Sequence, residues 1–146
     1  MSKARIILVT VFLSGILLGS IVYAAYQHFQ PIRNVGTVRV IGVDVFADAE
    51  LTSRLTEIPW GVMSPDESRN VTVWIQNTGN YAQKLVMWTE SWNPTSAFDF
   101  ISLTWDYDDS WIPVNDAILV VFTLSLDADI TGVTNFSFEL WVKGVH

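Results

Sequence analysis

The chain has 146 residues, no cysteine, seven tryptophans and a net charge of −7. The absence of cysteine excludes disulfides, thiol catalysis and cysteine-ligated metal sites. All fifteen acidic residues follow position 26, and this acidic character argues against nucleic acid as a partner, because phosphate contacts need lysine and arginine.

The N-terminus begins with a long apolar run. Residues 6–25 carry no charged side chain, and Lys3 and Arg5 stand just before them. A helix of that length spans about 30 Å, the hydrocarbon thickness of a bilayer. The two basic residues bias the N-terminus to the cytoplasm. We therefore expect residues 1–26 to be a signal anchor or a signal peptide, with the rest of the chain outside the plasma membrane.

The sequence leaves cleavage of this segment open. The run is longer than the apolar region of a usual signal peptide, which favours a retained anchor. Val22 and Ala24 nevertheless suit the positions that signal peptidase reads, and cleavage after Ala24 would give a secreted or surface-bound form. Gly15 and Gly19 have the spacing that lets two membrane helices pack closely, so they are candidates for helix packing.

The remaining chain is expected to form a stalk and one domain. Residues 27–36 are polar and contain Pro31, which is typical of a stalk; residues 37–146 then form an extracellular domain. In this domain the apolar residues recur with a period of two, and turn-forming residues separate the segments. An extra residue at 41–42 indicates a bulge. The expected strands are 37–40, 43–46, 57–61, 70–77, 84–91, 100–105, 117–126 and 135–143.

Two of these segments have expected places in a sheet. Pro59 donates no ladder hydrogen bond, so residues 57–61 are expected at an edge. The long apolar segment 117–126 is expected at a sheet centre. No helical pattern follows the membrane segment. The sequence therefore predicts an all-β fold, an antiparallel immunoglobulin-like β-sandwich of about seven strands.

Two parts of the chain after the membrane segment resemble known classes of β-sandwich protein. The stretch WGVMSPDESRNVTVWIQNTGN, residues 60–80, resembles the turn, V-x-V strand and N-x-G-N signature of immunoglobulin-like adhesion-type modules of the CARDB class. Residues 36–144 resemble small exported β-sandwich proteins of archaea, with a WNP motif at 92–94 and an ITGxTxFSF motif at 130–138. Asp66 stands where a turn glycine is usual. The resemblance implies a sandwich outside the cell and includes no catalytic residue.

Acidic residues give the one weak metal candidate. Asp106, Asp108 and Asp109 are the densest carboxylate cluster, and hard oxygen ligands at this spacing can bind Ca²⁺ outside the cell. A polar hairpin turn explains the same residues, since aspartate favours turns. Asp127 and Asp129 form a weaker pair with the same two interpretations.

The residues of catalytic chemistry are scarce. His28 and His146 are the only histidines, and neither has the sequence neighbours of a triad or a zinc site. A glycosidase carboxylate pair is not expected on a small domain without insertions that form a cleft. We therefore expect a protein that is not an enzyme and holds no cofactor.

Tryptophans give the main candidate surface. In the alternation of strands 70–77 and 84–91, Trp74 and Trp88 point away from the core. If these strands pair, the two indoles form a flat platform that suits a protein partner or, less well, a carbohydrate. A loop that covers them is the plain alternative. Trp92, Trp105 and Trp141 are expected to pack in the core.

The sequence leaves three functions open. The first is a non-catalytic surface protein that acts by contact with a protein partner or with copies of itself. The second is a filament subunit in which residues 37–46 fill a groove in a neighbour after cleavage at Ala24. The third is an accessory subunit of a membrane complex. Asn70 and Asn135 begin N-glycosylation sequons and would lie outside the membrane in each case.

Overall fold

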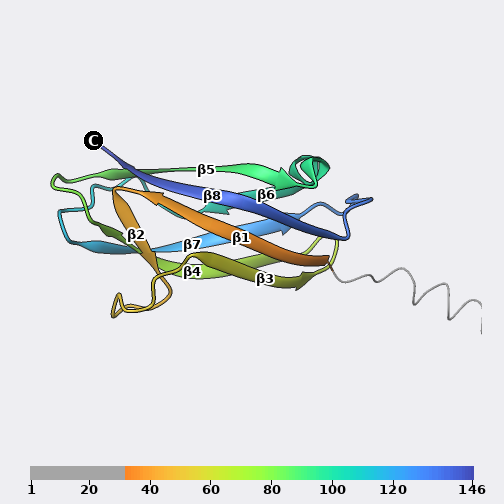
Figure 1. Ribbon diagram of the computed structural model, residues 1–146, viewed down its shortest axis with the longest axis horizontal. Helices are drawn as coiled ribbons and strands as arrows, with labels where there is room; N and C mark the ends of the chain where they lie inside the picture. Colours follow the sequence, from red (N-terminus) through yellow and green to blue (C-terminus); the bar gives the residue numbers. More distant parts are fainter. Residues whose placement is uncertain (1–31) are drawn as a thin grey trace, which may run out of the picture. The chain divides into compact units, whose positions relative to one another are not determined.

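The computed structural model describes residues 32–146, which form eight strands and one short 3-10 helix (Figure 1). The all-β expectation is confirmed, with eight strands rather than about seven, because every predicted segment contains a strand. In chain order the elements are β1 (Ile32–Ile41), β2 (Val43–Phe46), β3 (Glu57–Met63), β4 (Ser68–Asn77), β5 (Lys84–Asn93), η1 (Thr95–Asp99), β6 (Ile101–Trp105), β7 (Ala117–Leu126) and β8 (Asn135–Val145).

The strands form two four-stranded sheets. Sheet A has the order β3-β1-β8-β5, and sheet B has the order β2-β4-β7-β6. All pairings are antiparallel except that of β1 with β8, which is parallel. The predicted positions of β3 at an edge and of β7 in a sheet interior are confirmed.

The start of the domain differs from the prediction. β1 begins at Ile32, inside the segment 27–36 that was expected to be a stalk. Asn34 and Gly36 are both buried and pair with β3 and β8. The stalk prediction was wrong here because a polar residue and a glycine occupy core positions, so the sequence looks solvent-exposed where it is not.

β1 and β2 are separated by a single residue that carries the chain from one sheet to the other. Ile41 pairs with Lys143 in sheet A, and Val43 pairs with Asn77 in sheet B. Gly42 between them has a φ of 72°, a conformation that side-chain-bearing residues rarely adopt. The bulge predicted at 41–42 is therefore the crossing point between the sheets.

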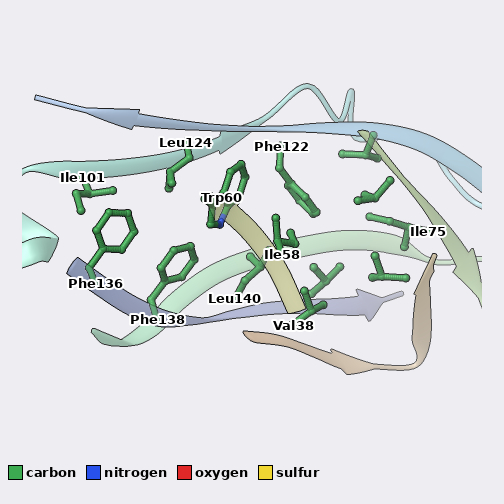
Figure 2. Packing of buried hydrophobic residues seen from close by; sticks show 14 of the residues in the cluster. Val38, Ile58, Trp60, Ile75, Ile101, Phe122, Leu124, Phe136, Phe138 and Leu140 are labelled. Carbon is green, nitrogen blue, oxygen red and sulfur yellow. The ribbon is translucent and has the colours of Figure 1, made fainter. Parts of the chain in front are cut away.

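The core lies between the two sheets (Figure 2). Trp60 of β3, Phe122 of β7 and Phe138 of β8 are fully or almost fully buried there, and they come from both sheets. Burial of a large apolar side chain contributes about 1.5–3 kcal/mol each. In the absence of cysteine, this aromatic and aliphatic core and the sheet ladders hold the domain together.

Candidate interaction surface

Both tryptophans that the sequence singled out lie on the outer surface of a sheet. On β4, Trp74 is half-buried and stands between the buried core residues Val73 and Ile75. On β5, Trp88 is 38% exposed, and the nearby Leu85 is buried. The alternation of the two strands therefore gave the orientation of both indoles correctly.

Trp74 and Trp88 lie on different sheets, so the prediction that they form one platform is wrong. β4 belongs to sheet B and β5 belongs to sheet A. The connection 78–83 is an arch between the sheets, held by the buried side chain of Asn77. Its Nδ2 donates to the carbonyls of Tyr81 (2.7 Å) and Ile112 (2.9 Å), and its Oδ1 accepts from the amide of Gly79 (2.9 Å). This arch directs β5 into the other sheet.

Trp88 stacks instead on Trp141, which lies directly opposite it on β8. The ring centroids are 5.5 Å apart and the planes differ by 8°. Each indole covers one face of the other, so the pair forms a ridge rather than two side-by-side rings. Trp141 was expected in the core, but the buried residues of this strand are its neighbours Leu140 and Val142. The alternation that placed Trp88 would also have identified Trp141.

The other two tryptophans that were expected in the core do pack against it. Trp92 stacks on Phe138, with ring centroids 4.4 Å apart and planes 17° apart. Trp105 stacks on Phe122, with centroids 6.1 Å apart and planes 9° apart. Both indoles are half-buried and contact the core cluster.

Exposed apolar side chains are more numerous on the outer face of sheet A than on the strands of sheet B. Ten large hydrophobic residues are exposed among those that the structure describes, and half of them lie on the outer face of sheet A. Of the others, only Leu119 lies on a strand of sheet B. The members on sheet A are Val35, Ile41, Val62, Val86 and Trp88.

One ion pair stands beside the ridge. Arg39, the register partner of Trp141, donates from Nε (3.1 Å) and Nη2 (2.8 Å) to Oε1 of Glu139. Ser91 Oγ donates to the other carboxylate oxygen at 3.2 Å. The hydrogen bond from Arg39 lowers the pKa of Glu139 below its usual value. The outer face of sheet A therefore carries a fixed pair of opposite charges beside the indole ridge.

The outer face of sheet B has a different character. Hydroxyl and amide side chains predominate around Ser68 of β4 and Ser125 of β7, whose Oγ atoms lie 2.8 Å apart. Farther along the same two strands, Trp74, Leu119 and Val121 occupy this face. The sequon residue Asn70 is exposed on this face, and Asn135 is exposed at the start of β8. The polar residues of this face are Ser68, Asn70, Thr72, Ser102, Thr104, Thr123 and Ser125.

The carboxylates of the predicted calcium candidate, Asp106, Asp108 and Asp109, each have a different partner and do not form a common site. Asp106 accepts from a backbone amide of β7 (2.7 Å), and Asp108 accepts from the amide of Ser110 (3.1 Å). Hydrogen bonds from Ser110 lower the pKa of Asp108. Asp109 pairs with Lys84 Nζ at 2.5 Å. No group of three histidine, cysteine or carboxylate side chains within residues 32–146 could hold a metal ion.

Two other features lie near the same loop. A hollow of about 290 Å³ is lined by Asp106, Tyr107, Asp108, Ser110, Ile118 and Leu119. The carboxylates in its wall already accept backbone hydrogen bonds. His146 stacks on Tyr81, with ring centroids 5.8 Å apart, and this contact is a packing interaction.

The predicted membrane segment precedes the described residues. The described part of the chain contains no helix long and apolar enough to cross a bilayer. The predicted helix over 6–25, with Gly15, Gly19 and the cleavage candidate Ala24, lies outside the described residues, as does His28.

No family model matches the chain, and no curated protein is similar to it at a significant level.

Proposed function

We propose that this protein is a non-catalytic cell-surface protein, anchored by residues 6–25, that acts by contact through the outer face of sheet A. The anchor and the outward location come from the apolar run and from the two basic residues before it. If the bond after Ala24 is cut, the same domain is secreted or retained at the surface.

The observation that carries this proposal is the difference between the outer faces. The outer face of sheet A exposes five large hydrophobic side chains, including Trp88 of the stacked Trp88–Trp141 pair, whereas the strands of sheet B expose one, Leu119, beside many hydroxyl groups. Exposed apolar patches with aromatic residues are typical of protein contacts. A sugar ring needs an open, flat aromatic face, and the stacked pair favours a protein partner over a carbohydrate.

Site-specific photo-crosslinking on intact cells tests the contact surface. A benzophenone amino acid is placed at Val86 on sheet A (40% exposed) or, as a control, at the apolar residue Leu119 on sheet B, which is at least as exposed (52%). We expect position 86 to give a discrete product of higher mass and position 119 to give none. Equal products from the two positions would overturn the assignment of the surface.

The mature N-terminus tests the anchor. An intact mass that begins at Met1 or Ser2, with a C-terminal tag that external protease removes from whole cells, is expected for an anchored domain outside the membrane. A tag that is protected in intact cells and digested only after lysis would refute the outward topology. A mass that begins at Ala25 would replace the anchor with a released form.

A second candidate is a filament subunit assembled by strand donation. β1 bonds to β3 on one side and to β8 on the other, and these two strands are not neighbours in the sheet. Removal of β1 would therefore leave a groove that the same strand of another copy could fill. The inward residues of β1 are Asn34, Gly36, Val38 and Val40, so this interior strand contributes two valines and no larger apolar side chain to the core.

Strand donation also predicts that the protein forms fibres on the cell surface. Surface protein sheared from cells should contain chains that begin at Ala25, and electron microscopy should show fibres of uniform width. Chains that retain Met1 or Ser2, together with an absence of fibres, would exclude this candidate and leave the tethered contact protein.

We also propose the finer assignment of the fold as immunoglobulin-like. Two four-stranded sheets with predominantly antiparallel pairing and a shared apolar core support this assignment. An experimental structure of the domain, superposed on immunoglobulin domains, tests it; strands that do not align in the same chain order would exclude it.

A further inference from the structure

Exposed sheet edges pair readily with other strands, and proteins usually block them. Sheet A ends at β3 and β5, and sheet B ends at β2 and β6. On β3, Pro59 has no amide hydrogen, and the guanidinium of Arg69 donates to the carbonyls of Trp60 and Val62 (2.9 Å to Val62). The free edge of β3 is therefore occupied.

The edges of sheet B are also protected. The chain after β2 returns along it: the amide of Leu55 donates to the carbonyl of Val45 at 2.7 Å, and Arg54 forms a bridge with Phe46. β6 has only five residues, and a very short edge strand offers few groups for pairing.

β5 is different, because it has ten residues and only its ends are blocked. At its start, Gln83 exchanges two hydrogen bonds with Ile112 (3.0 and 2.8 Å), and the amide of Leu85 donates to Tyr107 Oη at 3.1 Å. Near its other end the pairing register shifts, and Ser91 has a φ of 56°. A bulge of this kind ends regular pairing.

The middle of β5 is open. Backbone groups of alternate residues point to the same side of a strand. Gln83 and Leu85 direct theirs away from β8, so Met87 and Thr89 do the same. No hydrogen bond within residues 32–146 uses the backbone amide or carbonyl of either residue on that side. Trp88 stands between them and directs its backbone groups toward β8.

We propose that a second copy of this chain pairs with the open part of β5 in antiparallel orientation, around a two-fold axis at Trp88. In this register Met87 of one copy lies opposite Thr89 of the other, and each of the two pairs exchanges an amide and a carbonyl bond. The two open amides and two open carbonyls of Met87 and Thr89 in one copy thereby pair with the same four groups of the other copy. This pairing rests on the proposed contact function and identifies the contact partner as a second copy of the chain.

The side chains outside the ladder agree with this register. Trp88 of one copy faces Trp88 of the other as a pair without direct backbone bonds, the arrangement with the closest side chains. The stacked Trp88–Trp141 pairs then continue into a row of four indoles across the axis. The exposed surface of Trp88 is covered in this arrangement.

Charge complementarity gives a second reason for a like partner. Lys143 lies beside Val86, and in the proposed register Val86 faces Glu90 of the second copy. Lys143 and Glu90 are then two strand spacings apart, about 10 Å between backbones, which their side chains can span above the small valine. Neither residue forms an ion pair within the described part of the chain.

Register-specific disulfides test the pairing in the full-length chain, purified in detergent. The chain has no cysteine, so each introduced thiol is unique. Opposed residues at the axis have Cα atoms about 4.5 Å apart, within the range of a disulfide. We expect Trp88→Cys to form a covalent dimer under mild oxidation. Val86→Cys alone should not, because two copies of residue 86 lie about 13 Å apart along the strands.

A mixture of two variants keeps the indoles in place. Val86→Cys chains mixed with Glu90→Cys chains should give only the mixed dimer. Failure of both Trp88→Cys and this mixture to cross-link would overturn the pairing. If Val86→Cys alone cross-links as efficiently as the mixture, the proposed register is overturned. Association through the membrane helices alone would also give this result, because it does not fix the register of β5.

Charge exchange gives an independent measure without cysteines. Lys143→Glu and Glu90→Lys should each weaken dimerisation by about three- to tenfold in sedimentation equilibrium, as expected for loss of two surface ion pairs and added repulsion. The double variant should recover the original affinity. Three variants that dimerise equally would contradict the predicted contact.

The two proposals can fail separately. If Val86 photo-crosslinks on cells while no disulfide forms at the axis, the contact surface stands and the second copy is excluded as its partner. If the disulfides form while positions 86 and 119 crosslink alike on cells, the pairing stands and the proposed contact function fails.

Discussion

Two buried asparagines, one in each sheet, show how differently two regions of the core are held. Asn77 at the end of β4 makes three hydrogen bonds that fix the arch between the sheets. Asn34 in β1 is 2% exposed, yet neither its Nδ2 nor its Oδ1 has a partner within the described residues. An unpaired buried polar group costs about 1–3 kcal/mol. β1 is therefore the less firmly held region.

The largest expected effect is at the well-held region. Asn77→Leu removes the side-chain partners of the buried carbonyl of Ile112, the part-buried carbonyl of Tyr81 and the amide of Gly79. We expect the free energy of unfolding to fall by about 3 kcal/mol. Urea denaturation followed by tryptophan fluorescence measures it. Asn80→Leu in the same arch is exposed and is the matched control, with an expected change within about 0.5 kcal/mol. Equal effects of the two variants would refute the role of Asn77.

The same exchange should have the opposite sign in β1. Asn34→Leu replaces an unpaired amide with an apolar group of similar size, and we expect stability to rise by about 1–2 kcal/mol. The change is measured in the same denaturation experiment. A loss of stability would mean that the amide of Asn34 is satisfied in solution, and the contrast between the two regions would disappear.

This contrast also bears on the second candidate function. β1 has an unpaired buried amide, a glycine and only a one-residue link to β2 at Gly42. Such a strand is more easily exchanged between copies than a strand whose buried polar groups are all hydrogen-bonded. If the protein forms fibres by strand donation, Asn34→Leu should slow their assembly from folded monomers. Unchanged assembly would indicate that β1 is not the donated strand.

A smaller effect is expected in the turn that connects the two sheets between β3 and β4. Asp66 has a φ of 63°, the conformation in which the family resemblance expects glycine. Asp66→Gly should raise the free energy of unfolding by about 1 kcal/mol, since glycine adopts this conformation without strain. Ser64→Gly, at a residue without positive φ, is the control and should not stabilise. Thermal unfolding that gives equal shifts for both would contradict this explanation.

The strands were predictable because each has a clear alternation between turn-forming residues. The same rule gave the outward direction of Trp88 and, applied to β8, would have given Trp141. Which strands become neighbours was not predictable, since a six-residue connection can form a hairpin or an arch. That choice depends on the buried bonds of Asn77 to groups as distant in sequence as Ile112. The open edge at Met87 and Thr89 depends on the same long-range contacts.

The smallest expected effect concerns acid stability and compares a carboxylate on the outer face of sheet A with one in the loop after β2 of sheet B. The hydrogen bond from Arg39 lowers the pKa of Glu139 on sheet A, and that from the Thr52 hydroxyl lowers the pKa of Asp48 in the loop after β2 of sheet B. A lowered folded-state pKa means that the unfolded state binds more protons in acid. This stability is fully present above the unfolded pKa values, 4.5 for glutamate and 3.8 for aspartate, and is lost as the pH falls through the lower folded values.

The melting temperature should therefore be nearly constant from neutral pH to about pH 5 and should fall below that. Arg39→Met should make the acid decline shallower through Glu139, and Thr52→Val should do so through Asp48 at a lower pH. Both variants are measured by thermal unfolding between pH 2.5 and pH 7. An Arg39→Met profile parallel to that of the unmodified chain would show that the Arg39–Glu139 pair does not persist in solution. The indole ridge of sheet A would then lack its fixed charges.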